Sequence, residues 1–140
     1  MAGGKSARRK GHNFERYIAK RLREEVYNGS PNIKRGHQTS IYDAVPDVET
    51  PHFWIECKCQ KSPNPAKALE QAETDMDKAG DDKLPVAITK KDRRKPVATM
   101  WIEDIMQLYK QGDSANIRVS MSLEDWINLA DVYANQYGEI

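Results

Sequence analysis

The segment "FWIECKCQ", Phe53 to Gln60, constrains the fold of this chain more than any other. It is dense in aromatic and β-type residues and follows a Thr50-Pro51 turn, so it predicts the second strand of a hairpin whose first strand lies near Asp47. Period two divides this strand into an apolar face (Phe53, Ile55, Cys57, Cys59) and a second face (Trp54, Glu56, Lys58, Gln60). We therefore expect one face to pack on a core while the other carries polar chemistry.

Two amphipathic helices flank this hairpin. "NFERYIAKRLREEVY" has apolar residues at steps of four and predicts a helix capped by Asn13, with Glu15 in its first turn and Gly29 just past its end. "AKALEQAETDMDKA" predicts a second helix that enters through Asn64 and Pro65. Between the first helix and the hairpin, a short strand is expected around residues 33–35.

The remaining segments alternate in type. "LPVAITK" and "PVATMW" read as strands joined by a basic turn, "IEDIMQLYK" as a short helix, "NIRVSM" as a strand, and "SLEDWINLADVYANQY" as a helix capped by Ser122. This order predicts a mixed α/β sheet with helices packed on it. We expect a single domain over residues 1–140, divided into a basic flexible arm (1–12), a core (13–111) and a C-terminal strand-helix extension (112–140).

Composition excludes several classes of protein. With 39% hydrophobic and 31% charged residues the chain is polar but able to fold, and its short apolar runs predict neither a membrane span nor a signal peptide. We therefore expect an intracellular, cytoplasmic protein. The two cysteines, Cys57 and Cys59, cannot form a disulfide framework. They are expected to be small buried thiols; the alternative, a zinc site completed by histidines, lacks the usual spacing.

Charge is unevenly placed although the formal net charge is only +1. Basic residues crowd the first 23 positions, against Glu15 alone, and return in "KKDRRK", Lys90 to Lys95. Acidic residues dominate the C-terminal portion. A solvated tail and a charged turn would explain either basic cluster alone, but the two together, beside a metal-type motif, indicate a nucleic-acid partner.

The motif joins Asp47 of the first strand to Glu56 and Lys58 of the second. Two carboxylates within reach of each other repel unless a cation or protons lie between them. Mg²⁺ fits, since it takes few carboxylates, keeps several waters and bridges to phosphate; Mn²⁺ is the other option. Lys58 can orient or acidify an attacking water, or offset charge on a phosphate. The spacing D-x8-E-x-K is degenerate, so a purely structural role for these residues is the alternative.

"VPDV" followed by "WIECK" resembles the PD-(D/E)xK nuclease superfamily, and "RRKGHNFERYIAKRL" resembles the N-terminal helix of its Holliday-junction-resolvase branch. The resemblance covers roughly residues 9–101, and Gly11, Glu15 and Arg16 match the helix motif. It implies a restriction-endonuclease-like core. The loop "GHQTSIYDAV" and the segment from residue 112 onward depart from the archaeal resolvases, and small phage-encoded members of the superfamily also look similar.

The resemblance implies an active site and its roles. Glu15, Asp47, Glu56, Lys58 and Gln60 would be catalytic, and Asp47, Glu56 and the backbone carbonyl of Cys57 would hold the metal. The residues expected to contact the DNA backbone are Lys5, Arg8, Arg9, Lys10, Arg16, Arg35, Lys90, Lys91, Arg93, Arg94 and Lys95.

The implied activity is a Mg²⁺-dependent endodeoxyribonuclease that cuts four-way junctions in DNA recombination or repair. A phage-encoded protein would act in the host cell cytoplasm. Symmetric cutting of a two-fold junction needs two sites, so we expect a homodimer. The alternatives are a nuclease of the same core acting on other DNA, by restriction-like, nicking or end-processing activity, and a non-catalytic DNA-binding module.

Several other residues have weaker cases. His12 and His37 could contact phosphate, although a loop histidine is more simply solvated. Asp43 is a second candidate for the metal aspartate, but Asp47 has the better spacing and follows a proline. Trp54 could stack on a base, whereas packing under a helix is the simpler expectation. Trp126 and Tyr133 fit a core or a subunit contact.

Overall fold

A computed structural model describes residues 4–37, 44–106 and 116–137 of the chain. Its elements are, in chain order, α1 (Gly4–Glu25), β1 (Lys34–Arg35), β2 (Val48–Glu49), β3 (Phe53–Gln60), α2 (Pro65–Lys78), β4 (Leu84–Lys91), β5 (Val97–Trp101), α3 (Ile102–Met106), β6 (Arg118–Ser122) and α4 (Leu123–Tyr137). The expected mixed α/β architecture is confirmed, as is the hairpin of β2 and β3.

The described strands form one six-stranded sheet in the order β1-β2-β3-β4-β5-β6. Only β3 and β4 pair in parallel, along their whole length, and α2 is the crossover between them. The other neighbours pair antiparallel. Because β1 and β2 are two residues long, their side of the sheet covers only the first half of β3.

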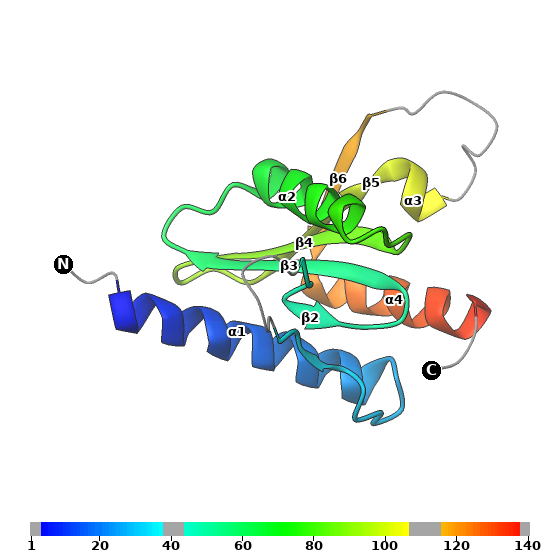
Figure 1. Cartoon of the computed structure of the whole chain (residues 1–140), viewed down its shortest axis with the longest axis horizontal. Helices are drawn as coiled ribbons and strands as arrows, with labels where there is room; N and C mark the ends of the chain where they lie inside the picture. Colours follow the sequence, from blue (N-terminus) through cyan, green and yellow to red (C-terminus); the bar gives the residue numbers. More distant parts are fainter. Residues whose placement is uncertain (1–3, 38–43, 107–115, 138–140) are drawn as a thin grey trace.

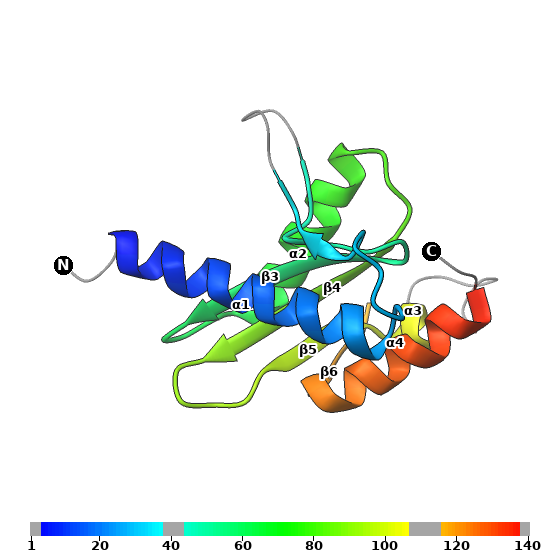
Figure 2. The same ribbon diagram turned by 90° about the horizontal axis from the view of Figure 1, so that it is seen from below.

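Helices cover both faces of the sheet. α1 and α4 lie side by side on one face, and α2 lies on the other, as the two views in Figures 1 and 2 show. Period two on β3 explains this arrangement. Phe53, Ile55 and Cys57 join the main core under α1 and α4, while Trp54 packs against Ala72 and Met76 of α2. The packing of Trp54 under a helix is thereby confirmed.

The C-terminal segment belongs to the main core. β6 pairs with β5 along five residues, and α4 places Trp126, fully buried, against Phe53. Ser122 caps α4 as predicted, with its Oγ accepting from the Asp125 N–H. The strand-helix extension expected from residue 112 onward thus contributes β6 to the sheet and places α4 beside α1 on the main core.

Helix α1 differs most from the prediction. It begins at Gly4, so residues 4–12, expected to be part of a flexible arm, are helical, and Asn13 lies inside the helix instead of capping it. The intervening lysines, arginines and alanine are good helix formers, and Gly11 alone is too weak a breaker to stop them. Glu15 consequently lies mid-helix, and a favourable interaction with the helix N-terminus does not explain its position.

Smaller elements agree with the sequence. Asn64 caps α2 with its side chain, Pro65 occupies the first turn, and Gly80 follows the helix with a positive φ of 70°. Of the helix expected over "IEDIMQLYK", the part up to Met106 is α3, and the rest lies outside the described residues. Among the residues described, no helix is long and apolar enough to cross a membrane.

Candidate active site

The candidate site lies beside the second half of β3, which extends past the short strand β2. Asp47, the residue before β2, lies next to this part of β3. The Asp47 N–H donates to the Ile55 carbonyl at 2.8 Å, and the Cys57 N–H donates to Oδ2 of Asp47, also at 2.8 Å. The carboxylate of Asp47 thus takes the place of a strand residue beside β3. Since the N–H and C=O of a strand residue face the same neighbour, the Cys57 carbonyl faces this position too.

The side chains of Glu56 and Lys58 lie on one face of β3, and the side chain of Cys57 lies on the other. Glu56 is only 5% exposed, while Lys58 is half-buried, and Lys58 Nζ lies 3.4 Å from Oε1 of Glu56. The two side chains therefore meet as the alternation of β3 predicts. A buried carboxylate with one partial cationic partner is poorly compensated, because ions lose much hydration on burial.

Electrostatics at the site follow from this crowding. Burial raises the pKa of the Glu56 carboxyl, and the negative charge of Asp47 raises it further, against the opposing effect of Lys58. Burial likewise raises the pKa of Asp47, and the negative charge of Glu15 adds to this. The carboxylates are thus held where an additional positive charge would be strongly favourable.

Glu15 reaches the site from α1. Its Oε1 accepts from Arg35 Nε at 2.9 Å, so the helix and β1 are joined by an ion pair. The same carboxylate influences both Asp47 and Cys57. Glu15 of α1, Arg35 of β1 and Asp47 before β2, far apart in the sequence, thus act on one region of the molecule.

The residues present suit a hard divalent cation. The part of the chain that is described contains no group of three His, Cys, Asp or Glu side chains arranged to hold a metal. Mg²⁺ does not require one, because it is commonly bound by one or two carboxylates together with waters and substrate phosphates. Asp47, Glu56 and the Cys57 carbonyl supply only oxygen, which matches Mg²⁺ or Mn²⁺ and not a soft metal.

Gln60 lies at the exposed end of β3. With Lys58 it lines a pocket of about 240 Å³ at the start of α2, together with Asn64, Lys67, Ala68 and Gln71. This lining contains two cations and three side-chain amides but no carboxylate. Gln60 therefore shares this pocket with Lys58.

The two basic clusters of the sequence meet in space. Lys10 of α1 forms an ion pair with Asp92 in the turn between β4 and β5. Lys91 at the end of β4 and Arg94 and Lys95 of the turn line a pocket of about 370 Å³. We call the surface formed by residues 5–10 and 90–95 the first basic surface. Lys5, Arg8 and Arg9 lie exposed on α1, and Arg93 is exposed in the turn.

Gly36, the residue after β1, brings the chain into close contact with the peptide before Asp47. Its N–H donates to the Asp47 carbonyl at 2.9 Å, and a Cβ at this position would collide with the backbone carbonyl oxygen of Pro46. Only glycine allows the chain to pass so close to the peptide that precedes Asp47. The sequence offered no indication of this contact.

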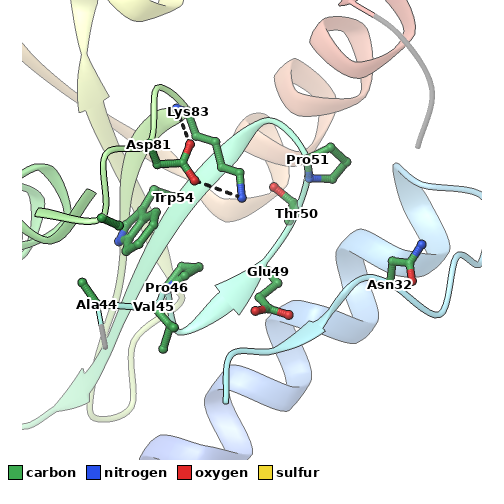
Figure 3. A pocket seen from close by; sticks show the side chains of 11 residues that line it. Asn32, Ala44, Val45, Pro46, Glu49, Thr50, Pro51, Trp54, Asp81 and Lys83 are labelled. Carbon is green, nitrogen blue, oxygen red and sulfur yellow. Dashed lines mark hydrogen bonds and ion pairs between the residues drawn. The ribbon is translucent and has the colours of Figure 1, made fainter. Parts of the chain in front are cut away.

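A further pocket, of about 430 Å³, lies near the start of β3 (Figure 3). Its charged lining is mixed: Glu49, with Lys83 paired to Asp81 at 3.5 Å. Trp54 lines it, and the buried Trp54 Nε1 has no hydrogen-bond partner among the described residues. Because the lining carries both acidic and basic side chains, the pocket favours neither an anionic nor a cationic ligand.

Three further basic residues were not among those expected to contact DNA. Lys20, Arg23 and Lys34 line a groove between α1 and β1 together with Arg16 and Arg35. The spacing of Arg16, Lys20 and Arg23 along one side of a helix was a usable signal, but the position of β1 beside them was not.

The weaker candidates have defined places. Cys57 is buried and Cys59 half-buried, both as free thiols, which confirms the structural interpretation in part. His12 is in α1 and not in a loop, whereas His37 is exposed outside the helices and strands. His52 contacts Tyr27 through a hydrogen bond of 2.9 Å. Asp43 lies outside the described residues.

A scan against protein-family models finds none that matches this chain, and a search of curated proteins finds no relative.

Proposed function

We propose that this protein is a divalent-metal-dependent endodeoxyribonuclease with a restriction-endonuclease-like core, related to the PD-(D/E)xK superfamily, and that it cleaves branched DNA such as four-way junctions. The observation that carries the proposal is the meeting of Asp47, Glu56 and Lys58 at the point where β3 loses its neighbour. The first basic surface adds a place for DNA backbone on the same molecule.

The chemistry assigns a role to each group. Asp47, Glu56 and the Cys57 carbonyl would hold Mg²⁺, which supplies charge stabilisation and a more acidic water for attack on phosphorus. Lys58, beside Glu56, would place its ammonium group where negative charge develops on the phosphate. Glu15 acts on Asp47 from α1 and would position the first carboxylate or the water next to it.

Two alternatives rest on specific contacts. Asp47 already accepts from the Cys57 N–H and Glu56 already pairs with Lys58, so both carboxylates have partners that a purely structural role would require. This favours the non-catalytic DNA-binding module as the second candidate. A nuclease of the same core that acts on linear DNA has the same residues and differs only in substrate.

Cleavage assays separate these possibilities. Purified protein is incubated with a labelled four-way junction and a matched linear duplex, with and without Mg²⁺. We expect Mg²⁺-dependent cleavage of the junction, and a loss of about 100-fold or more in Lys58→Ala. Lys61→Ala is the matched control, since Lys61 is exposed beyond the end of β3.

Each result has a distinct meaning. Equal cleavage of both substrates would reject the junction preference and leave a nuclease. Binding without cleavage, unchanged in Lys58→Ala, would support the module. Light scattering tests the proposed homodimer in the same preparation: a monomer that cuts both sides of a junction in one binding event would contradict the need for two sites.

A further inference from the structure

The groove between α1 and β1 is strongly charged. Its volume is about 480 Å³, and its lining is Arg16, Ala19, Lys20, Arg23, Lys34 and Arg35. Every lining residue except Ala19 is a cation, and none is acidic. The linings of the three pockets described above are less uniform in charge.

Hydrogen bonds between α1 and the segment before β1 hold these cations close together. Arg23 donates from Nε and Nη2 to the Ile33 carbonyl at 3.0 and 2.8 Å, which fixes the start of β1 against α1. Arg16, Lys20 and Arg23 follow one another on the same side of the helix. Lys34 and Arg35 of β1 form the other wall of the groove.

Few of these charges are compensated inside the protein. Arg35 pairs with Glu15, and Arg16 donates to the side-chain oxygen of Asn13. Lys20 and Lys34 have neither an ion pair nor a side-chain hydrogen bond within the described ranges. Like charges gathered on one surface repel, so the groove gains most from a ligand that brings several negative charges.

The position of the groove suggests what that ligand is. Arg35 belongs to the groove and also contacts Glu15, so the groove opens directly beside the candidate active site. The first basic surface begins at Lys10, on the N-terminal half of the same helix. Glu15 lies between the two along α1, and a chain of phosphates that reaches both would pass the carboxylates.

We propose that the α1–β1 groove binds the phosphodiester backbone of the substrate DNA, on the opposite side of the active site from the turn between β4 and β5. This inference rests on the proposed function and extends it to a second contact region. The contact is made through charge to phosphate oxygens, which positions the backbone and carries no sequence information.

The test uses the double variant Lys20→Gln/Lys34→Gln. Both residues are exposed, so their substitution leaves the packing intact, which thermal unfolding verifies. The matched control is Lys78→Gln/Arg118→Gln, which removes the same charge from the end of α2 and from β6, away from the groove. Binding to a labelled junction and to a duplex is measured by fluorescence anisotropy without metal, over a range of salt concentrations.

We expect the groove variant to bind about tenfold more weakly, with a salt dependence whose log–log slope is less steep by about 2, while the control changes little. Equal binding by both variants would reject the groove while the binding of the parent protein leaves the proposed function standing. Failure of the parent protein to bind DNA would reject both. Binding that depends on the groove without any cleavage in Mg²⁺ would support the groove and reject the nuclease.

Discussion

Both halves of β3 pair with β4 on one side, but only the first half has a neighbouring strand, β2, on the other. The first half, Phe53–Ile55, lies between β2 and β4, and all its side chains are buried. The second half, Glu56–Gln60, still pairs with β4, but β2 has ended and the Asp47 carboxylate stands in its place. One strand therefore serves as a core element and then as the wall of a polar site.

The difference shows how a site can be built by ending a strand early. Loss of a neighbouring strand frees the N–H and C=O of Cys57, and buried backbone groups need partners. A carboxylate can satisfy the N–H, and a cation can satisfy the carbonyl. The remaining sheet meanwhile keeps Glu56 buried, which raises the pKa of its carboxyl, and the burial of Asp47 raises the pKa of that carboxyl too.

Ile55→Ala tests the core half with the largest expected effect. Ile55 is fully buried, so its truncation leaves a cavity and should lower the free energy of unfolding by about 3–4 kcal/mol. The same truncation at the exposed far end, Gln60→Ala, should change it by less than about 0.5 kcal/mol. Urea unfolding at pH 7 measures both. Similar values for the two variants would contradict the proposed division of β3.

Gly36→Ala tests the boundary between the halves. The new methyl group would collide with the Pro46 carbonyl and push the chain before Asp47 away from β3. This should lower the free energy of unfolding by about 2–3 kcal/mol. Gly11→Ala is the control, because a Cβ there meets nothing within 4 Å, and helix propensity predicts a gain of about 0.5–1 kcal/mol. Thermal unfolding separates them. A stable Gly36→Ala variant would show that this approach is not required.

Glu56→Gln tests the polar half, with an effect of opposite sign. Because the folded-state pKa of Glu56 is raised, the unfolded chain releases its proton first as pH increases, and stability falls above the ordinary glutamate pKa of about 4.3. Glu56→Gln cannot ionise, so at pH 8 without metal it should be more stable than the parent by on the order of 2 kcal/mol.

The comparison for Glu56→Gln is its pH profile of unfolding between pH 5 and 9 against that of Asp82→Asn, which alters an exposed carboxylate. The parent protein and Asp82→Asn should both lose stability with rising pH, and Glu56→Gln should lose less. A steeper loss in Glu56→Gln would contradict burial as the cause of the raised pKa.

Thr50→Ala has the smallest expected effect and tests the turn that gives the first half its neighbour. The Thr50 hydroxyl accepts from the Phe53 N–H at 2.9 Å and donates to the Phe53 carbonyl at 3.1 Å. Its removal should lower stability by about 1 kcal/mol. Thr50→Ser keeps the hydroxyl and should restore most of this loss. Equal unfolding of both variants would assign the effect to the lost methyl group instead.

Alternation and turn chemistry were sufficient to predict β3 to the residue. The hairpin, the cap at Asn64 and the two faces of the strand follow from local patterns that tertiary contacts did not override. The meeting of Asp47, Glu56 and Lys58 was predictable for the same reason, because a hairpin with a short turn fixes which residues lie opposite.

Features that depend on distant contacts were not predictable. The start of α1 at Gly4 has no strong local signal, because a run of lysines and arginines is compatible with either a helix or a solvated tail. The α1–β1 groove required β1 to lie beside α1, which is set by the Arg23–Ile33 contact. The burial of Trp126 against Phe53 likewise could not be read from either segment alone.

Because α1 is one continuous helix, it fixes the distance between the basic residues along it. At a rise of 1.5 Å per residue, Lys10 and Lys20 are separated by about 15 Å along the axis, and no hinge interrupts the helix between them. A full turn of B-form DNA measures about 34–36 Å. Lys10 of the first basic surface and Lys20 of the groove would therefore lie slightly less than half a turn of DNA apart. This distance is fixed by the helix, so straight and branched DNA, which differ in shape, would match it differently.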